Sequence, residues 1–406
     1  MTQPNQPPAP ATPEATDPSC GDVGRRHFLA GTGLAAAAVT LGAGMNGLGA
    51  APARAESKSP LTFRDHTFRI VQFNDTQDDE RIDRRTIELM EKVLDSEKPD
   101  LVVLNGDNIT GGCEDERAMR QAMNNVVVPM EERGIPWVLT YGNHDEDSTP
   151  QGGLDEEEML DIYRSYPHNH NEPSPEGVTG SGNMALTIRA TDRRQGAAFT
   201  LFLLDSGRYA PAQVAGQDFS GYPTWDWVRM NQVEWYCQTS RALEKRWRKK
   251  VPALMFIHIP LWEHRFMWFG GVDERNGGNH EAAVVRHSIT GERNEDECPG
   301  PVNSGLFSAI LDRGDVKGVF CGHDHVNTYC GNYYGVLLGY SGNTGFGTYG
   351  LSGAERNRLR GARVFDLDDR TDDVLVGTRM VFAADYGIDL TADDQPIEPL
   401  PLPGER

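Results

Sequence analysis

The sequence has few cysteines and no CxxC pair. Its 406 residues include six cysteines. A zinc ribbon requires cysteine pairs at that spacing, so this class of metal protein is disfavoured. If the N-terminal segment is removed, five cysteines remain, and these permit at most two disulfides in an oxidising compartment. The sequence leaves their pairing open.

Basic residues are also scarce relative to acidic ones. Lys and Arg total 39 against 60 Asp and Glu, which gives a formal net charge of -21. A nucleic acid or an anionic membrane would be repelled over most of such a surface, so we expect no nucleic-acid scaffold as a partner. An anionic substrate then requires a local positive site, and bound metal ions are one way to provide it in an acidic protein.

The chain also lacks an apolar run suited to crossing a membrane. Its most apolar stretch, residues 28–51, is short for a span and is diluted by glycines, so we expect no stable membrane span. The motif GRRHFL at residues 24–29 resembles a twin-arginine export signal, and ARA at residues 53–55 has the small-x-small form of a signal-peptidase site. We therefore expect residues 1–55 to be a cleaved signal peptide. The export machinery would be a partner, and the mature chain would be secreted or held in the cell envelope; a membrane anchor is the alternative.

Short apolar runs recur along the remaining chain, and amphipathic helical patterns lie between several of them. The runs are typical of buried strands, and strand–helix–strand order favours an α/β domain with ligands at the carboxyl ends of the strands. Strands are predicted at 68–73, 101–104, 137–140, 199–204, 254–257, 316–320, 333–338, 362–367 and 374–381. Helical spacing of apolar residues is found at 87–94, 119–126 and 306–311.

The later part of the chain has a different composition. The last three predicted strands have no obvious crossover helices between them, so the sheets are expected to be mixed. Residues 266–301 are rich in glycine and charge and are predicted to form a long loop. Residues 393–406, rich in proline and acid, are predicted to be a disordered tail. No clear linker divides residues 56–392, which we expect to form one domain.

Polar residues that suit metal binding follow several predicted strands. NDTQ at residues 74–77 follows the first strand, and alternation at a strand end would point Asp75 and Gln77 to the same side, toward one ion. NGDN at residues 105–108 follows the second, where the two carboxylate oxygens of Asp107 could bridge two ions. Taken alone, each cluster is more simply a turn or a helix cap.

The third cluster combines a metal ligand with a proton donor. It is YGNHD at residues 141–145. Asn143 offers a neutral oxygen ligand, and His144 is suited to giving a proton to a leaving alkoxide, with Asp145 orienting its imidazole. The alternative is a polar turn that contains a hydrogen-bonded histidine.

Histidines dominate the last two clusters. His258 interrupts an apolar run just before Pro260, a position where a core histidine is the simpler interpretation. GHDH at residues 322–325 places His323 and His325 two residues apart at a strand end. Paired imidazoles after a glycine are the strongest single signal in the sequence, although a mononuclear site would also fit.

Five such clusters after separate strands are far less probable as coincidence than any one of them. In order and spacing the series resembles the calcineurin-like metallophosphoesterases over about 250 residues. HIP at 258–260, GHDHVN at 322–327 and GNTGFGTYG at 342–350 look like the branch with small purple-acid-phosphatase-like enzymes of plants and fungi. The resemblance implies a four-layer αββα sandwich of two mixed β-sheets flanked by helices, with two metal ions at one edge.

The resemblance also implies ligands and a reaction. His144 would assist the leaving group, and a metal-bridging hydroxide would attack phosphorus in line. The expected function is hydrolysis of a small-molecule phosphomonoester outside the cytoplasm. The alternatives are a phosphodiesterase acting on nucleotides or phospholipid headgroups, and a catalytically weakened metal-binding homologue. One ion would be held by Asp75, Gln77, Asp107 and His325, and the other by Asp107, Asn143, His258 and His323.

Two positions depart from the family pattern. The usual first motif is Asp-x-His, whereas this chain has Gln77 at the histidine position. An amide oxygen is a poorer ligand than imidazole for iron or zinc, so Gln77 favours manganese or another harder ion at this site. Purple members carry a tyrosine where this chain has Thr110, so we do not expect a purple protein. Iron, manganese, zinc and calcium all remain possible. His264 and Arg265 are candidate substrate contacts, unless the aromatic segment around them covers a core edge.

Overall fold

The computed structural model describes residues 58–220, 224–271 and 279–405. The predicted signal peptide, residues 1–55, lies outside these ranges. Within them, no helix combines the length and apolar character needed to cross a membrane.

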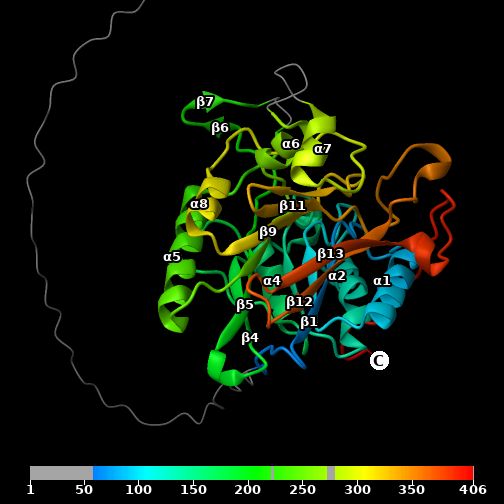
Figure 1. Cartoon of the computed structure of the whole chain (residues 1–406). Coiled ribbons are helices and arrows are strands. Elements are labelled where there is room, and N and C mark those ends of the chain that lie inside the picture. Colours follow the sequence, from blue (N-terminus) through cyan, green and yellow to red (C-terminus); the bar gives the residue numbers. More distant parts are fainter. Residues whose placement is uncertain (1–57, 221–223, 272–278, 406) are drawn as a thin grey trace, which may run out of the picture. The chain divides into compact units, whose positions relative to one another are not determined.

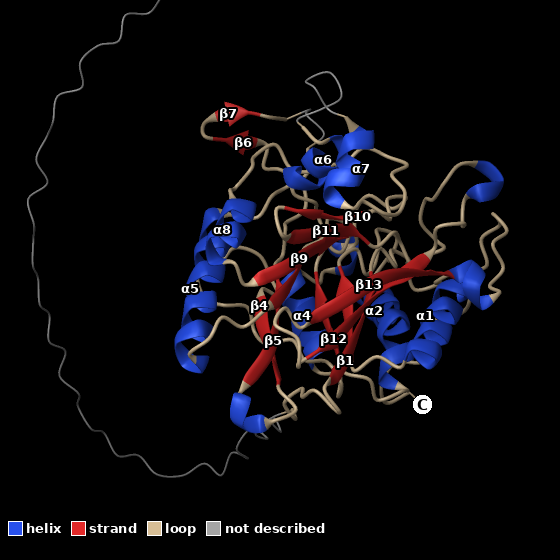
Figure 2. Cartoon of the chain, in the orientation of Figure 1, coloured by secondary structure: helices blue, strands red, loops and turns tan. Residues whose placement is uncertain are grey.

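Two mixed sheets form the centre of the domain (Figures 1 and 2). The first has the order β13-β12-β1-β2-β3, and the second has the order β10-β11-β9-β8-β5-β4. In the first sheet β1, β2 and β3 are parallel, while β12 and β13 form an antiparallel hairpin at one side. In the second sheet β5, β8, β9 and β11 are parallel, and antiparallel β4 and β10 close its two edges.

The strands of the first sheet are β1 (Thr67–Phe73), β2 (Leu101–Asn105), β3 (Trp137–Thr140), β12 (Gly361–Asp368) and β13 (Leu375–Phe382). Those of the second are β4 (Met184–Arg189), β5 (Ala197–Leu203), β8 (Ala253–Phe256), β9 (Val316–Cys321), β10 (Cys330–Tyr333) and β11 (Val336–Tyr340). A separate small ribbon pairs β6 (Gln213–Val214) with β7 (Gln217–Asp218).

Helices cover the outer face of each sheet, as Figure 1 shows with α1 and α2 on one side and α5 and α8 on the other. The first sheet packs against α1 (Arg84–Glu97), α2 (Glu116–Glu131) and α4 (Glu156–Arg164), and short α3 (Thr149–Gly152) lies beside α2. The second packs against α5 (Met230–Trp247), α6 (Trp262–Phe269), α7 (His280–His287) and α8 (Leu306–Arg313). The predicted four-layer αββα architecture is confirmed.

Side-chain alternation along the strands creates the layers. In β1, Phe68 and Ile70 enter the core between the sheets, whereas Val71 and Phe73 enter the core beneath the helices. Because successive strand residues point to opposite faces, an uninterrupted apolar run fits a strand that is covered on both sides. The polar clusters directly follow the carboxyl ends of the parallel strands β1, β2, β3, β8 and β9.

Two predictions about the later chain are wrong. The strand predicted at 333–338 is broken by a two-residue turn, in which Tyr334 and Gly335 have φ values of 53° and 90°. Positive φ at both positions is the geometry of a tight hairpin turn, so the apolar residues belong to two strands. The loop predicted at 266–301 contains the end of α6 and all of α7, because Met267 and Ala283 pack into the core.

The prediction of a disordered tail is also wrong. The backbone N–H of Arg84 donates to the Gln395 carbonyl at 2.9 Å, and that of Ile397 donates to the Ile82 carbonyl at 3.0 Å. The buried Asp83–Arg85 ion pair, 2.7 Å between Nη2 and Oδ2, also holds the backbone of this segment. Composition favoured disorder, but these specific hydrogen bonds order the tail against the start of α1.

The cysteines form no disulfide within the described residues. All five cysteines there are free thiols: Cys113, Cys237, Cys298, Cys321 and Cys330.

Candidate metal centre

Loops after β1, β2, β3, β8 and β9 bring the predicted ligands together. Two sets of buried side chains offer ligand atoms within 4.8 Å of one another: Asp107, His258 and His323 in one, and Asp75, Asp107 and His325 in the other. Asp107 belongs to both sets. This is the arrangement expected when one carboxylate bridges two ions.

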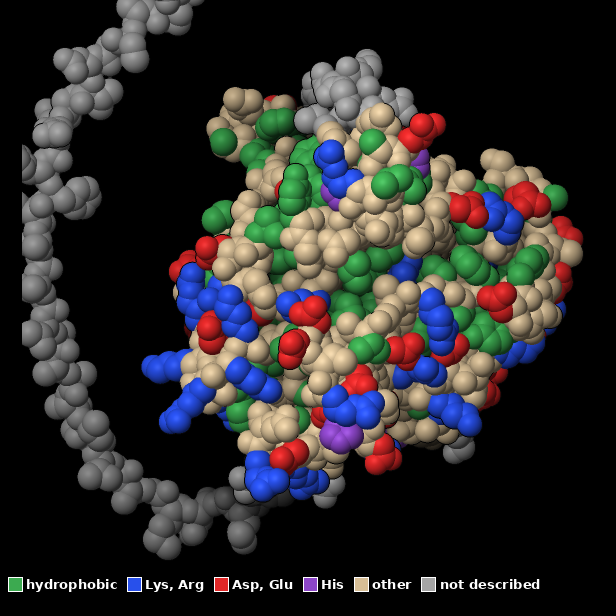
Figure 3. All heavy atoms as spheres, viewed as in Figure 1, with side chains coloured by type: hydrophobic (Ala, Val, Ile, Leu, Met, Phe, Trp, Pro, Cys, Tyr) green, Lys and Arg blue, Asp and Glu red, His purple; other side chains and the backbone are tan. Residues whose placement is uncertain are grey.

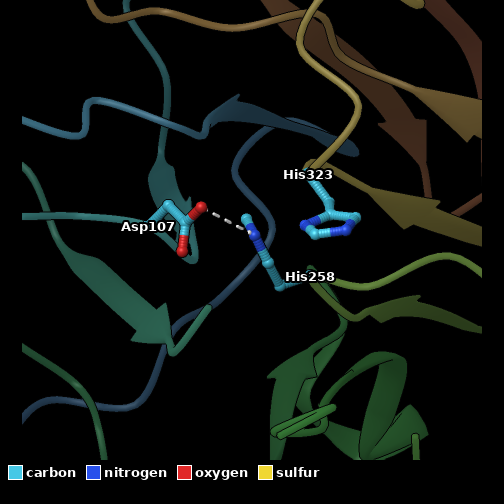
Figure 4. Close-up of side chains that lie close together, drawn as sticks. All are labelled: Asp107, His258 and His323. Carbon is cyan, nitrogen blue, oxygen red and sulfur yellow. Dashed lines mark ion pairs between the residues drawn. The ribbon is translucent and has the colours of Figure 1, made fainter. Parts of the chain in front are cut away.

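His258 is oriented for metal binding by a backbone carbonyl. Its Nδ1 lies 3.0 Å from the Asn105 carbonyl oxygen, which accepts its proton, and its Nε2 lies 3.1 Å from Asp107 Oδ2. Figure 4 shows the Asp107 carboxylate and the His258 ring facing each other, with the His323 ring beside them. A hydrogen bond at one ring nitrogen leaves the other nitrogen free to bind a metal.

His325 is held in a similar way in the other set. Its Nδ1 lies 3.3 Å from the Tyr349 carbonyl, and its ring stacks on the Tyr349 ring at 4.0 Å. Its Nε2 faces Asp75 Oδ1 at 3.4 Å. The backbone N–H of His323 also donates to Asp75 Oδ1 at 3.1 Å, which ties the first and last motifs together.

Unpaired buried atoms indicate that metal ions fit this donor set. Asn143 Oδ1 is buried and has no hydrogen-bond partner within the described residues, and the buried Asp107 Oδ2 and His258 Nε2 meet as an ion pair without a further hydrogen bond there. Buried polar atoms without partners are costly and rare, and all three are carboxylate, amide or imidazole ligand atoms. Bound ions would satisfy them.

The electrostatic field at the site also favours positive charge. Burial alone would lower the pKa of His258, but the carboxylates of Asp107 and Asp75 raise it to about 10. Two buried carboxylates facing imidazoles therefore stabilise a cation at this position.

Two glycines are required by close approach in this centre. Gly106 has a φ of +85°, and a Cβ there would lie 2.5 Å from His258 Nδ1. A Cβ on Gly142 would lie 2.3 Å from Asp107 Oδ1. Both glycines precede predicted ligands, so their role is to let neighbouring loops converge.

Gln77 occupies the position of the usual histidine. It is largely buried, and its Oε1 accepts a hydrogen bond from the Thr348 hydroxyl at 2.7 Å. Its backbone N–H donates to the Asp107 carbonyl at 2.9 Å, which places the residue beside the bridging carboxylate. An amide oxygen has a second lone pair, so this contact is compatible with metal binding. Coordination by Gln77 stays a prediction.

His144 is oriented by Asp147, so the prediction that Asp145 orients it is wrong. His144 Nδ1 lies 2.5 Å from Asp147 Oδ2, and Arg208 Nη2 donates to Asp147 Oδ1 at 2.7 Å. A backbone hydrogen bond from Asp147 to the His144 carbonyl, 2.9 Å long, forms the turn that brings the two side chains together. His144 Nε2 is therefore the nitrogen available to a substrate.

Asp145 instead holds the loops together. Its carboxylate is buried and accepts backbone N–H groups from Gly142 at 2.8 Å, Asn108 at 2.8 Å and Ile109 at 3.2 Å. Burial and the nearby Asp107 raise the pKa of Asp145 to about 7. The carboxylate of Asp145 therefore joins two motif loops. This is a structural role, and it differs from the predicted orientation of His144.

The two predicted substrate contacts do not lie in the centre. His264 is fully buried, with its ring 5.4 Å from the Tyr340 ring, and burial lowers its pKa to about 4. Arg265 pairs with Glu297 at 3.3 Å and Asp296 at 3.5 Å. Helix α6 directs His264 to the core, so the prediction that His264 binds substrate is wrong. It directs Arg265 to an acidic loop, and substrate contact by Arg265 stays a prediction.

Sequence reasoning missed Arg208 and Tyr209 beside His144, and it left Trp225 open between a substrate wall and the cover of a core edge. Tyr209 Oη lies 3.5 Å from His144 Nδ1, and the Trp225 ring lies 4.6 Å from the His323 ring. Arg208 also donates to the Asn143 carbonyl at 3.1 Å. These residues lie in a loop without a motif. The only available signal was Asp147, three residues after His144.

The chain matches the family model described as "Calcineurin-like phosphoesterase" over residues 68–327. This match spans all five motifs, and the chain belongs to that family. It is thus a member of a family of phosphoester hydrolases.

Three relatives give the comparison more detail. "Probable inactive purple acid phosphatase 14" of Arabidopsis thaliana is 35% identical over 289 residues, which are 68% of this chain and 65% of the relative. "Probable inactive purple acid phosphatase 29" of the same plant is 33% identical over 300 residues, 70% of this chain and 69% of the relative. "Phosphatase DCR2" of Saccharomyces cerevisiae is 28% identical over 257 residues, 62% of this chain and 40% of the relative. The chain therefore spans about two thirds of the first two relatives and less of the third.

Proposed function

We propose that this chain is an exported, metal-dependent phosphomonoesterase. The observation that carries the proposal is the pair of ligand sets sharing Asp107, with His144 beside them. The backbone N–H of His144 donates to Asp107 Oδ1 at 2.8 Å, so the proton donor and the bridging carboxylate are fixed relative to each other. Such a site is suited to an ester whose phosphoryl group binds at the ions and whose leaving oxygen faces His144.

The protein side chains have separable roles in this proposal. Two ions, when bound, would supply a nucleophile from water and neutralise charge on the phosphoryl oxygens. Asp75, Asp107, His258, His323 and His325 would hold them, with Asn143 and Gln77 completing the two shells. His144 Nε2 would protonate the leaving oxygen, while Asp147 and Arg208 keep the ring in position.

The names of the plant relatives raise the alternative of an inactive, metal-binding homologue, and Gln77 points the same way. Retention of His144 with an ordered carboxylate partner supports catalysis, because a protein that only binds metal has no need of a positioned acid. The Asp147–Arg208 contact strengthens this point, because it fixes a carboxylate whose other oxygen faces the His144 imidazole and the nearby Tyr209 hydroxyl.

The direct test is turnover by purified, metal-loaded protein of an aryl phosphate and a bis-aryl phosphate. We expect the monoester to be hydrolysed faster, and a faster diester rate would support the phosphodiesterase alternative. Absence of turnover of both compounds with every divalent ion tried would refute the proposal.

The His144→Ala variant tests the mechanism. Its backbone N–H still reaches Asp107, so metal content should be kept while kcat falls by about 10²–10⁴-fold. His168→Ala is a matched control, because His168 also pairs with a carboxylate, Glu131, at 2.9 Å. It lies at the amino end of β3, where its carbonyl accepts from Trp137, and its removal should leave kcat unchanged.

The proposal that the chain is exported rests on the sequence of residues 1–55. We propose that the twin-arginine machinery carries the folded chain. Replacement of both Arg25 and Arg26 by Lys should keep the full-length protein inside the cell, whereas the unaltered chain should be recovered outside the cytoplasm with Glu56 as its first residue. Recovery of the altered chain outside at the normal level would contradict this route.

A further inference from the structure

Two segments form an aromatic rim beside the metal centre. Tyr209 and Trp225 face each other in an isolated antiparallel bridge, supported by hydrogen bonds from Ala210 N to the Thr224 carbonyl (3.1 Å) and from Asp226 N to the Arg208 carbonyl (2.9 Å). The two rings are 5.6 Å apart with an angle of 34° between their planes. Cross-strand pairing therefore presents two large rings side by side.

Each ring contacts a different functional side chain. Tyr209 Oη lies 3.5 Å from His144 Nδ1 and 3.3 Å from Asp147 Oδ2, and the Trp225 ring meets the His323 ring edge-on at 4.6 Å and 84°. The Trp225 side chain also lies beside that of Cys298. Tyr209 is nevertheless 44% exposed. The rim is thus anchored at its polar edges, and its apolar surface remains accessible.

The position of His144 decides which part of a substrate meets this rim. Because Asp147 occupies Nδ1, the proton for the leaving oxygen must come from Nε2. The leaving group then lies on the Nε2 side of His144, while Tyr209 contacts the Nδ1 edge of that ring and holds its partner Trp225 beside His323. A substrate whose phosphoryl group is held between the ligand sets would extend its leaving group along Tyr209 and Trp225.

Charges around the rim disfavour a second anionic group on the substrate. The arginines of the surrounding loops are paired with carboxylates. On the lower part of the face that Figure 3 draws, basic side chains likewise lie beside acidic ones. Their charge is therefore largely compensated within the protein. The pairs are Arg208 with Glu146 and Asp147, Arg229 with Asp226, and Arg293 with Asp296 and Glu297.

We propose that Tyr209 and Trp225 form a subsite for a planar aromatic, uncharged leaving group. The inference rests on the proposed phosphomonoesterase function and specifies its substrate class. Planar groups gain offset or edge-to-face contacts with such rings, whereas flexible alkyl groups gain only area. Neither residue is required for the chemical step, so the subsite governs selectivity.

The test compares benzyl phosphate with n-butyl phosphate as substrates of the metal-loaded protein. Both release a primary alkoxide, and because the small difference in their acidity is the same for every variant, a change of the ratio in the rim variants reports on the ring. We expect kcat/KM to favour benzyl phosphate by about three- to tenfold. A carboxylate on the benzyl ring should remove this advantage. Equal kcat/KM values for benzyl and butyl phosphate, or faster turnover of the carboxylated compound, would overturn the inference.

Variants locate the subsite. In Tyr209→Leu and Trp225→Leu the benzyl-to-butyl ratio should fall toward one, whatever the absolute rate. Tyr334→Leu is the control, because Tyr334 is 71% exposed in the β10–β11 turn, at the opposite end of β11 from the metal centre. It should keep both the rate and the ratio. A ratio that is unchanged in both rim variants would overturn the assignment.

Binding of non-hydrolysable phosphonates separates this inference from the proposed function. Calorimetry with benzylphosphonate and n-butylphosphonate needs no turnover and applies to variants that have lost activity. If neither phosphate is hydrolysed, the proposed function fails, yet tighter binding of benzylphosphonate would still support the aromatic subsite. Equal binding of the two phosphonates by the unaltered protein would contradict it.

Discussion

Replacing Asp147 by Asn tests how the proton donor is positioned. Asp147 Oδ2 lies 2.5 Å from His144 Nδ1, and the two side chains are 25% and 30% exposed. A hydrogen bond to a charged group contributes about 1.5–3 kcal/mol, and partial exposure favours the lower part, about 1.5–2 kcal/mol. If this interaction holds the reactive ring orientation, kcat should fall by about 10- to 30-fold.

The pH profile gives a second readout of the same variant. Burial lowers the pKa of His144, but Asp147 and Asp107 raise it above its usual value. Loss of the Asp147 carboxylate lowers that pKa. Because a general acid must be protonated, the basic limb of the kcat profile should move to lower pH.

The assay is steady-state hydrolysis of benzyl phosphate, whose alkoxide needs a proton, with metal content measured on the same sample. Asp145→Asn is the control. Its amide NH₂ would face the Gly142 N–H, so two donors would meet, and we expect this variant to lose stability and bound metal together. If Asp147→Asn keeps kcat within twofold at full metal content, the positioning role of Asp147 is refuted.

Three further substitutions test other parts of the structure. Gly142→Ala places a Cβ 2.3 Å from Asp107 Oδ1 and should reduce bound metal, as elemental analysis will show; unchanged occupancy would contradict the close approach. Asp83→Asn leaves the Arg85 charge buried without its carboxylate and should lower the free energy of unfolding in urea by about 3 kcal/mol; a change below about 1 kcal/mol would contradict the role of this pair. Gln77→His should increase zinc affinity at the first ion, measured by competition with a chelator, and an unaltered affinity would show that residue 77 is not a ligand.

The sequence predicted the buried strands because burial on both faces leaves a clear pattern, whereas the four-layer arrangement came from the family resemblance. Strands such as β1 and β2 are continuous apolar runs followed by polar clusters, and these features are visible without coordinates. The β10–β11 hairpin was missed because its turn, Tyr334 with Gly335, lies inside an apolar run. The ordered tail was missed because its stability comes from a few hydrogen bonds to Asp83 and its neighbours, which composition does not encode.

The metal ligands could be predicted from the sequence, whereas the residues that support them could not. Asp107, His258 and His323 belong to motifs with fixed spacing at strand ends, and the structure brings them together. Asp147 orients His144 through a local turn, whereas the adjacent Asp145 is directed into the loop backbone. Neighbouring carboxylates in a turn are chemically alike, so only their directions in space distinguish the two roles.

The most direct test of the account is metal titration of the chelator-treated protein, with ions per chain and benzyl phosphate hydrolysis followed together. The two ligand sets sharing Asp107 predict that activity rises with metal content and reaches its maximum at two ions per chain. Full activity with no ion, or with one ion per chain, would contradict a two-metal centre.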